Sequence, residues 1–401
     1  MKQRAPSKSY VSLLLIAVGL LVLPHLAGQF GNSWIRILDF ALLYLMLALG
    51  LNIVIGFAGL LDLGYIAFYA VGAYLYALLA SPHLTDNFET LAQWFPQGLH
   101  ISIWFALPLC AAGAALFGIL LGAPVLKLRG DYLAIVTLGF GEIIRIFLNN
   151  LNAPVNITNG PQGVNLIDPV HIAGVDLSRT MEIGGVEISG LTGYYYLFLA
   201  LALLIMFVCL RLQDSRIGRA WMALREDELA AKAMGINTRN IKLLAFAMGA
   251  TFGGVAGALF AALQGFISPE SFSLMESIVV LAMVVLGGMG HIPGVVLGAL
   301  LLAALPEALR HWLPPLREVL ISYLIAWLEY FRIFLSPPLR DAFVPVGEGV
   351  LDFIKRLLEP EVFRSLIFGL AMVVIMLMRP KGLWPSPEAK YQLPAQAEEP
   401  A

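Results

Sequence analysis

Charged residues are scarce in this sequence. They make up 13% of its 401 residues, about half of the roughly 25% found in soluble globular domains, whereas 59% of the residues are hydrophobic. A soluble fold could not cover so much apolar surface, so the composition predicts a protein that crosses a membrane several times. The net charge of −2 is close to neutral and indicates nothing about partners.

Cysteine, metal-binding and catalytic motifs are equally sparse. Cys110 and Cys209 lie inside apolar runs without metal-ligand spacing, which indicates packing residues. No lysine follows a glycine, so the sequence has no phosphate-binding P-loop and is not expected to hydrolyse ATP by the usual route. No histidine precedes a glutamate, and there is no Gly-x-Ser-x-Gly motif. We therefore expect no catalytic residue, no metal site and no cofactor in this chain.

About ten apolar runs approach the length of roughly 20 residues that a membrane-spanning helix needs. The first resembles a signal peptide, but it is long enough to span and no small-x-small cleavage site follows it. The sequence therefore predicts an all-α polytopic membrane protein with about ten transmembrane helices in a single domain over residues 1–385. The runs cover roughly residues 10–30, 35–56, 64–80, 101–124, 131–149, 193–211, 243–263, 276–290, 293–310 and 362–379.

The distribution of basic residues predicts the orientation of the chain. Residues 81–100 contain no Lys or Arg, and residues 150–192 contain only Arg179. Basic residues instead gather in the stretch 211–242 and around Lys127 and Arg379. Because positive residues stay in the cytoplasm, both termini and the stretch 211–242 are expected on the cytoplasmic side.

Two regions near the C-terminus are expected to differ from the spans. Within residues 311–361, the stretch from Glu318 to Leu335 is apolar, but Glu329 and Arg332 interrupt it, and the pairs Pro314-Pro315 and Pro337-Pro338 bracket it. This pattern favours an amphipathic helix in an insertion on the outer face over an eleventh span. The Pro-, Ala- and Glu-rich residues 386–401 are predicted to form a disordered tail.

Two glycine-rich stretches interrupt the apolar runs in a similar way. Each separates two runs and is followed by a helix with small residues, so the sequence contains a possible internal repeat. Glycine lets the backbone leave a helix beside a cavity, which makes these breaks candidates for the lining of a translocation path. Plain close packing of helices is the alternative. The candidate residues are Gly56, Gly59 and Gly64 in the first break, and Gly287, Gly288 and Gly290 in the second.

Three ionisable residues lie in or beside the apolar runs. Glu142 and Arg145 are three positions apart near the middle of a predicted span, so they share a helix face and can pair. Charges at that depth are costly, and they either line a path or form an ion pair that orients the helix. Asp62 beside the first break is either a helix cap or a residue at the inner mouth of the path.

The polar stretch 211–242 carries seven Lys or Arg and four Asp or Glu between two apolar runs. Residues 226–234 favour a helix with Met222, Leu229 and Ala233 on one face, and Gly235 stands where a helix would end. Asn237 or Thr238 can cap the next helix. The pattern predicts a short helix on the cytoplasmic surface that transmits a push to the membrane helices. An ordinary basic loop is the alternative.

Several motifs in order resemble the permeases of branched-chain amino acid ABC transporters, of the LivM type. The stretch from Glu228 to Gly235 resembles the Glu-Ala-Ala…Gly loop of ABC importer permeases, with the acid one position away from the strict spacing. The resemblance covers residues 35–310 and 362–385. Further motifs that carry it are Ala48-Leu-Gly-Leu-Asn52, Gly130-Asp-Tyr-Leu-Ala-Ile-Val-Thr-Leu-Gly139, Asn159-Gly-Pro-Gln-Gly163, Ser215-Arg-Ile-Gly-Arg219 and Arg379-Pro-Lys-Gly-Leu-Trp-Pro385.

The resemblance implies a permease subunit in the bacterial inner membrane that imports branched-chain or other hydrophobic amino acids. Its partners would be the lipid bilayer, a second, similar permease, two ATPases that bind the ATP, and a periplasmic or extracellular binding protein; no nucleic acid is expected. Related substrates such as urea, amides or aromatic acids, or an ion-coupled secondary transporter, are the alternatives. The implied coupling residues are Arg216, Gly218, Arg219, Arg225, Glu226, Glu228, Ala231 and Gly235.

Overall fold

The computed structural model describes most of the chain up to Phe334. Residues 6–96, 98–125, 128, 130–172, 175–177, 179–183 and 186–334 are described, together with separate positions between 349 and 384. The chain forms two compact units, one of Met1–Leu300 with Lys381–Ala401 and one of Leu301–Pro380. The predicted tail, residues 386–401, lies outside the described residues.

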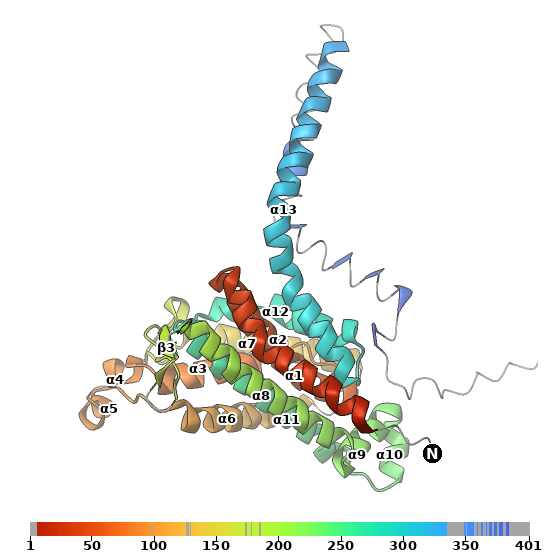
Figure 1. Ribbon diagram of the computed structural model, residues 1–401. Helices are drawn as coiled ribbons and strands as arrows, with labels where there is room; N and C mark the ends of the chain where they lie inside the picture. Colours follow the sequence, from red (N-terminus) through yellow and green to blue (C-terminus); the bar gives the residue numbers. More distant parts are fainter. Residues whose placement is uncertain are drawn as a thin grey trace, which may run out of the picture. The chain divides into compact units, whose positions relative to one another are not determined.

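The first unit consists mainly of long helices, as Figure 1 shows. The all-α prediction is confirmed, and nine of the ten predicted runs contain a helix, while the run 362–379 falls where only separate positions are described. These helices are α1 (Pro6–Gln29), α2 (Asn32–Asn52), α3 (Ile66–Leu79), α6 (Ile103–Val125), α7 (Asp131–Asn150), α8 (Gly190–Gln213), α11 (Thr238–Gln264), α12 (Leu274–Gly287) and α13 (Ile292–Phe334). Only the part of α13 up to Leu300 belongs to the first unit.

Short elements fill the connections between these helices. Two antiparallel hairpins, β1–β2 and β3–β4, pair Ile172 with Val175 and Ile183 with Val186. The short elements are η1 (Ile53–Phe57), α4 (His83–Asn87), α5 (Glu89–Trp94), η2 (Gly160–Gln162), β1 (His171–Ile172), β2 (Val175–Asp176), β3 (Met181–Ile183), β4 (Val186–Ile188), α9 (Arg216–Glu226), α10 (Glu228–Ala233) and η3 (Pro269–Phe272).

The helices differ in how far they could reach across a membrane. Four described stretches are long and apolar enough to cross one, namely Asn32–Phe57, Ile103–Val125, Gly190–Gln213 and Thr238–Gln264. By contrast α3 and α12 have 14 residues each. At 1.5 Å per residue each is about 21 Å long, shorter than the roughly 30 Å of hydrocarbon in a bilayer. The runs predicted at 64–80 and 276–290 are therefore half-helices that adjoin a break in the backbone.

Helix α11 lies at the centre of the first unit, packed against α2, α3 and α6. Small residues allow this close approach. A side chain at Gly72 of α3 would overlap the backbone of Gly254 in α11, and one at Gly257 would overlap the carbonyl of Tyr69. Close backbone contact at small residues is how helices associate when both sides are apolar. Both cysteines, Cys110 and Cys209, are buried among these helices, as predicted.

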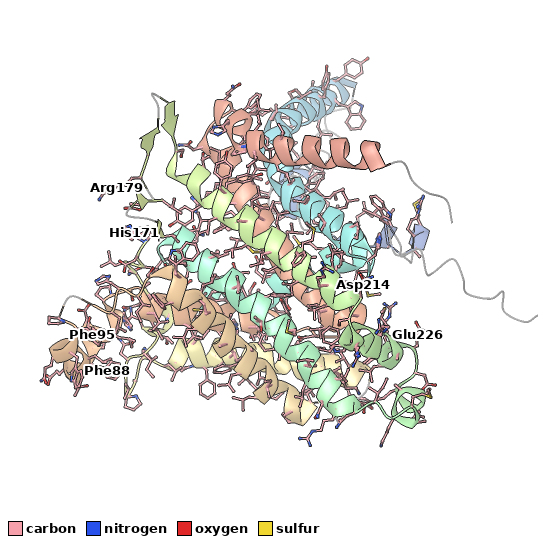
Figure 2. The ribbon with its side chains drawn as sticks, turned by 60° about the horizontal axis from the view of Figure 1, so that its bottom comes forward. Phe88, Phe95, His171, Arg179, Asp214 and Glu226 are labelled. Carbon is pink, nitrogen blue, oxygen red and sulfur yellow. The ribbon has the colours of Figure 1, made fainter. Side chains whose placement is uncertain are left out.

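The two ends of the first unit carry different structures. At one end, α8 leads into α9 and α10, which return the chain to α11 (Figure 1). Figure 2 shows Asp214 and Glu226 at this end, and His171, Arg179 and Phe95 at the opposite one. The polar stretch 211–242 is therefore a compact cap on one end of the bundle.

The predicted boundary near residue 310 is wrong, because α13 continues as one helix from Ile292 to Phe334. The helix continues through Pro314-Pro315, although proline removes a backbone donor and crowds the carbonyl four residues earlier. Long apolar helices tolerate such prolines where neighbouring groups satisfy the freed carbonyl. The described part of the second unit is mainly this continuation of α13. The placement of residues 311–361 on the outer face stays a prediction.

Candidate functional site: the junction of two helix breaks

The first break follows α2. The chain passes through a single π-helical turn, Ile53–Phe57, and is then irregular until α3 begins at Ile66. π-Turns within longer helices are rare and occur often at functional sites. Gly59 has φ +68°, a conformation that side chains other than glycine seldom adopt. The glycine-rich sequence thus produces the break that was predicted from it.

The second break separates α12 from α13 and is shorter. Helix α12 ends at Gly287, and Gly288 and Gly290 have φ +114° and +82°. Helix α13 starts at Ile292, so the backbone reverses within four residues. A side chain at Gly287 would overlap the carbonyl of Gly294, which explains why glycine is required at this crossing. Both stretches of the possible repeat therefore form a helix, a break and a second helix.

The two breaks lie against each other. The backbone N–H of Gly290 donates to the side-chain oxygen of Asn52 at 2.9 Å. The hydroxyl of Ser277 on α12 donates to the carbonyl of Leu63 in the first break at 2.7 Å. An ideal Cβ at Gly56 would lie 2.5 Å from the nitrogen of Gly290, so only glycine permits this approach. Backbone groups that leave a helix inside an apolar bundle need such partners.

Arg225 joins the polar cap to this junction. Its Nη1 donates to the carbonyl of Gly56 at 2.6 Å. The same atom is 2.8 Å from where a Cβ of Gly290 would stand, and the Cγ of Arg225 is 2.8 Å from the corresponding position at Gly59. The side chain therefore runs along the first break and reaches both breaks with its guanidinium. Arg225 therefore connects the predicted coupling residues of the polar cap with the glycines of the two breaks, which the sequence predicted separately.

The polar cap consists of two helices and not one. Asp227 is extended and caps α10 by accepting from the N–H groups of Leu229 and Ala230 at 2.7 and 3.0 Å. This cap corrects the predicted single helix over 226–234. Gly235 has φ +84° and follows the end of α10, and Asn237 caps α11 by accepting from Asn240 at 3.2 Å, both as predicted.

The buried face of the cap also differs from the prediction. Trp221 and Leu224 of α9 and Ala231 of α10 are buried, and the indole N–H of Trp221 donates to the carbonyl of Ile241 at 2.8 Å. Leu229 and Met234 instead point outward, with exposed fractions of 66% and 83%. The sequence placed Leu229 on one face with Met222 and Ala233, but the residues that are buried, Trp221, Leu224 and Ala231, lie on another side of the helical sequence.

The remaining predicted coupling residues take different positions. Arg216 and Glu226 are exposed on α9. The guanidinium of Arg219 donates to the carbonyl of Asp214 at 3.0 Å and stays within the cap. Gly218 is buried where a side chain would overlap the carbonyl of Leu212.

A partly buried ion pair fastens the cap to α11. The Nζ of Lys242 lies 2.6 Å from the carboxylate of Glu228, and the Lys242 side chain is only 6% exposed. A buried ammonium is tolerated when such a partner neutralises it. Both residues line a cavity of about 230 Å³ together with Gly59, Asp131 and Arg225. The cavity thus lies directly beside the junction, between the cap and the first break.

Asp62 and Gly64 lie in the first break but face α7. Asp62 is 1% exposed, and one of its oxygens accepts from the N–H of Gly64 at 2.9 Å, close to the start of α3. A side chain at Gly64 would overlap the carbonyl of Thr137, whose hydroxyl accepts from the N–H of Leu63 at 3.0 Å. Asp62 therefore has cap-like geometry at a packed contact.

Glu142 and Arg145 form the predicted ion pair on α7, with Nε and Oε2 3.0 Å apart. Nη1 of Arg145 also lies 3.7 Å from the carboxylate of Glu270 in η3. Neither residue lines the cavity beside the junction. The pair therefore connects α7 to η3, and a role in the path stays a prediction.

Sequence reasoning missed three contributors to the junction. Asn52 and Ser277 are buried polar residues in apolar helices, a signal that could have identified them. The third is the segment that contains Leu383 and Trp384. The N–H of Leu383 donates to the carbonyl of Leu286 at 2.9 Å, and the carbonyl of Trp384 lies 2.8 Å from Nδ1 of His291. The motif near the C-terminus therefore packs on the second break.

Two helix breaks that meet between apolar helices, with a polar cap attached to them, define a multi-pass membrane permease with broken helices. Residues 33–328 match the family described as "Branched-chain amino acid transport system / permease component". The chain belongs to this family of branched-chain amino acid transport permeases.

The chain is similar to LivM and LivH permeases of bacteria. The chain is 45% identical to LivM of Escherichia coli over 75% of its own length and 70% of that protein. It is 46% identical to LivM of Salmonella typhimurium over 69% of its length and 63% of that protein. It is also 29% identical to LivH of Escherichia coli, over 66% of its length and 81% of that protein. No solved structure matches the chain.

Proposed function

We propose that this chain is a permease subunit of an ABC importer that moves branched-chain amino acids into the cell. Separate ATPase subunits supply the energy, and a binding protein delivers the substrate on the outer side. The observation that carries the proposal is the contact of Arg225 with Gly56. Through this contact a movement of the polar cap reaches the two helix breaks without any intermediate element.

The polar cap supplies the cytoplasmic side of this device. Its seven Lys or Arg obey the positive-inside rule, so α9 and α10 lie in the cytoplasm and both termini lie on the same side. The hairpins β1–β2 and β3–β4, at the opposite end, face the outer side, where the binding protein docks. Breaks that meet between apolar helices fit alternating access, in which one half of the bundle moves against the other.

Leu229 and Met234 form the contact surface for an ATPase. Both are apolar, and both are exposed at the tip of the cap beside Lys232. Exposed apolar residues with a polar rim are typical of sites where another protein docks. The similarity to both LivM and LivH permeases supports a second, similar permease as the other partner.

Reconstitution tests the docking surface and the function together. We expect ATP-driven leucine uptake into proteoliposomes that contain this chain, a second permease subunit, the ATPases and a binding protein. The double variant Leu229→Asp, Met234→Asp should lose copurification of the ATPases and uptake by at least about tenfold, because charges replace apolar contacts. The matched control Val155→Asp, at an exposed apolar residue at the opposite end from the cap, should keep copurification of the ATPases.

Two results would contradict the proposal. The first is the absence of ATP-driven amino acid uptake by the complete wild-type assembly. The second is uptake by the purified chain alone, driven by an ion gradient without an ATPase, which would make it a secondary transporter. If the ATPases copurify with the double variant at the wild-type level, only the proposed docking surface is contradicted, and the proposed function still stands.

A further inference from the structure

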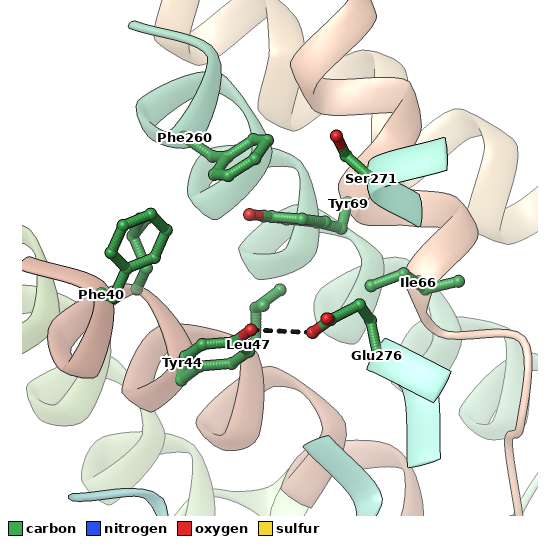
Figure 3. Close-up of a pocket in the computed structure, with 9 residues that line it drawn as sticks. Phe40, Tyr44, Leu47, Ile66, Tyr69, Phe260, Ser271 and Glu276 are labelled. Carbon is green, nitrogen blue, oxygen red and sulfur yellow. Dashed lines mark hydrogen bonds between the residues drawn. The ribbon is translucent and has the colours of Figure 1, made fainter. Parts of the chain in front are cut away.

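A second cavity lies on the far side of the junction from the polar cap. It has a volume of about 220 Å³ and is enclosed by α2, α3, α11, η3 and α12 (Figure 3). Leu47 lines this cavity, and Asn52 of the same helix bonds to the second break. Five residues of α-helix correspond to about 7.5 Å, so the cavity and the junction are successive positions along α2.

The wall of this cavity combines one carboxylate with several aromatic rings. Glu276 points into it and accepts a hydrogen bond from the hydroxyl of Tyr44 at 2.7 Å (Figure 3). The rings of Phe40, Tyr69 and Phe260 surround the same space, with the centroids of Tyr69 and Phe260 5.3 Å apart. A carboxylate attracts a cation, and aromatic faces attract one at distances up to about 6 Å.

The rest of the wall is apolar. Leu43, Leu47 and Ile66 are buried and line the cavity beside the rings. A cavity of about 150 Å³ holds benzene, with six non-hydrogen atoms, so one of about 220 Å³ fits the roughly nine non-hydrogen atoms of leucine. Ser271 adds a neutral hydroxyl to the wall.

We propose that this cavity is a transit site for a zwitterionic aliphatic amino acid, with Glu276 as the partner of the substrate ammonium group. The branched side chain lies against Leu43, Leu47 and Ile66, and the substrate carboxylate faces Ser271. An ionisable residue between membrane helices is costly and marks a functional site by default. The proposal rests on the function proposed above and names the site where the substrate pauses.

The position of Glu276 also connects the transit site to the junction. The next residue, Ser277, donates to the carbonyl of Leu63 in the first break at 2.7 Å. A substrate ammonium draws the carboxylate of Glu276 away from Tyr44 and so acts on the helix turn that holds the break. Substrate bound in the cavity thereby changes the contact between α12 and the first break, at the closed inner side of the path.

Equilibrium binding tests this site apart from transport. The importer is assembled in lipid nanodiscs without its binding protein, and radiolabelled leucine is the probe. We expect displacement by 3-methylbutylamine, which keeps the ammonium group, and little displacement by 4-methylpentanoate, which lacks it. Glu276→Gln should weaken leucine binding by about tenfold or more, because a hydrogen bond to a charged group is lost.

Two controls keep the outcome clear. Glu270→Gln removes a carboxylate that is 73% exposed on η3, six residues earlier, and should leave leucine binding unchanged. If Glu276→Gln fails to assemble with its partners, Leu47→Phe tests the transit site instead. Its larger ring fills part of the cavity, so it should reduce leucine binding far more than alanine binding. Equal leucine binding by wild type, Glu276→Gln and Leu47→Phe would overturn the transit site. The proposed function would still stand if wild-type uptake remained ATP-driven.

Discussion

The contact of Arg225 with Gly56 gives the sharpest prediction, because removing it should loosen the junction on the side of the polar cap. The variant Arg225→Met keeps a side chain that covers the first break but loses the guanidinium that donates at 2.6 Å. A hydrogen bond from a charged donor is worth about 1.5–3 kcal/mol. Arg225 is an exposed residue, and solvent weakens its hydrogen bond, so the lower end of that range applies.

A stability loss of about 1.5 kcal/mol corresponds to roughly a tenfold larger open population. A cysteine in place of Ala58, which is 2% exposed and directly follows the π-turn, reports this population. Its rate of labelling by a membrane-impermeant maleimide, applied from the side of the polar cap, should rise about tenfold in Arg225→Met. Labelling follows the open population when opening and closing are fast. The native thiols, Cys110 and Cys209, are buried and contribute little background.

Arg219→Met is the matched control for this experiment. Arg219 lies on the same helix and also donates to a carbonyl, but that carbonyl belongs to Asp214 within the cap. Its loss should leave the labelling rate at Ala58→Cys unchanged. Equal rates in the two variants would show that the Arg225 contact does not hold the junction closed, and the mechanism would need another connection.

Two further predictions concern how the bundle is held together, and thermal unfolding of the purified chain measures both. Glu228→Gln should cost about 1–3 kcal/mol, because Lys242 keeps a buried charge without this partner, whereas Glu228 itself is 30% exposed. Adding Lys242→Met should restore most of the loss, and an unchanged midpoint for Glu228→Gln would contradict the importance of this pair. Gly72→Ala should lower the free energy of unfolding by about 1–3 kcal/mol, because the new methyl overlaps the backbone of Gly254. Its control is Gly139→Ala, which should be neutral or slightly stabilising because no neighbour lies within 4 Å of the new methyl. Comparable losses in the two glycine variants would refute the close α3–α11 contact.

Local features of the fold were predictable from the sequence because they depend on neighbouring residues. Apolar runs located the helices, and Gly235 and Asn237 marked the helix ends on either side of a short turn. The glycines of the two breaks predicted where the backbone leaves the helix. The ion pair of Glu142 and Arg145 followed from helical spacing alone.

The junction itself was not predictable, because it depends on contacts between distant parts of the chain. Nothing near Arg225 indicates that its guanidinium reaches Gly56, which is 169 positions away. The same holds for the contact between Asn52 and Gly290, 238 positions apart. Helical spacing alone also did not show that Trp221, Leu224 and Ala231 form the buried face of the cap, because burial depends on packing against α11.

The distance between the polar cap and the first break tests the central claim most directly. Spin labels at Glu226 on α9 and Leu61 in the first break, both at exposed positions, report it in the assembled importer. A single short distance is expected without nucleotide, and a second, longer one when ATP and the loaded binding protein drive the cycle. A distance distribution that stays unchanged while leucine is transported would contradict a junction that opens at Arg225.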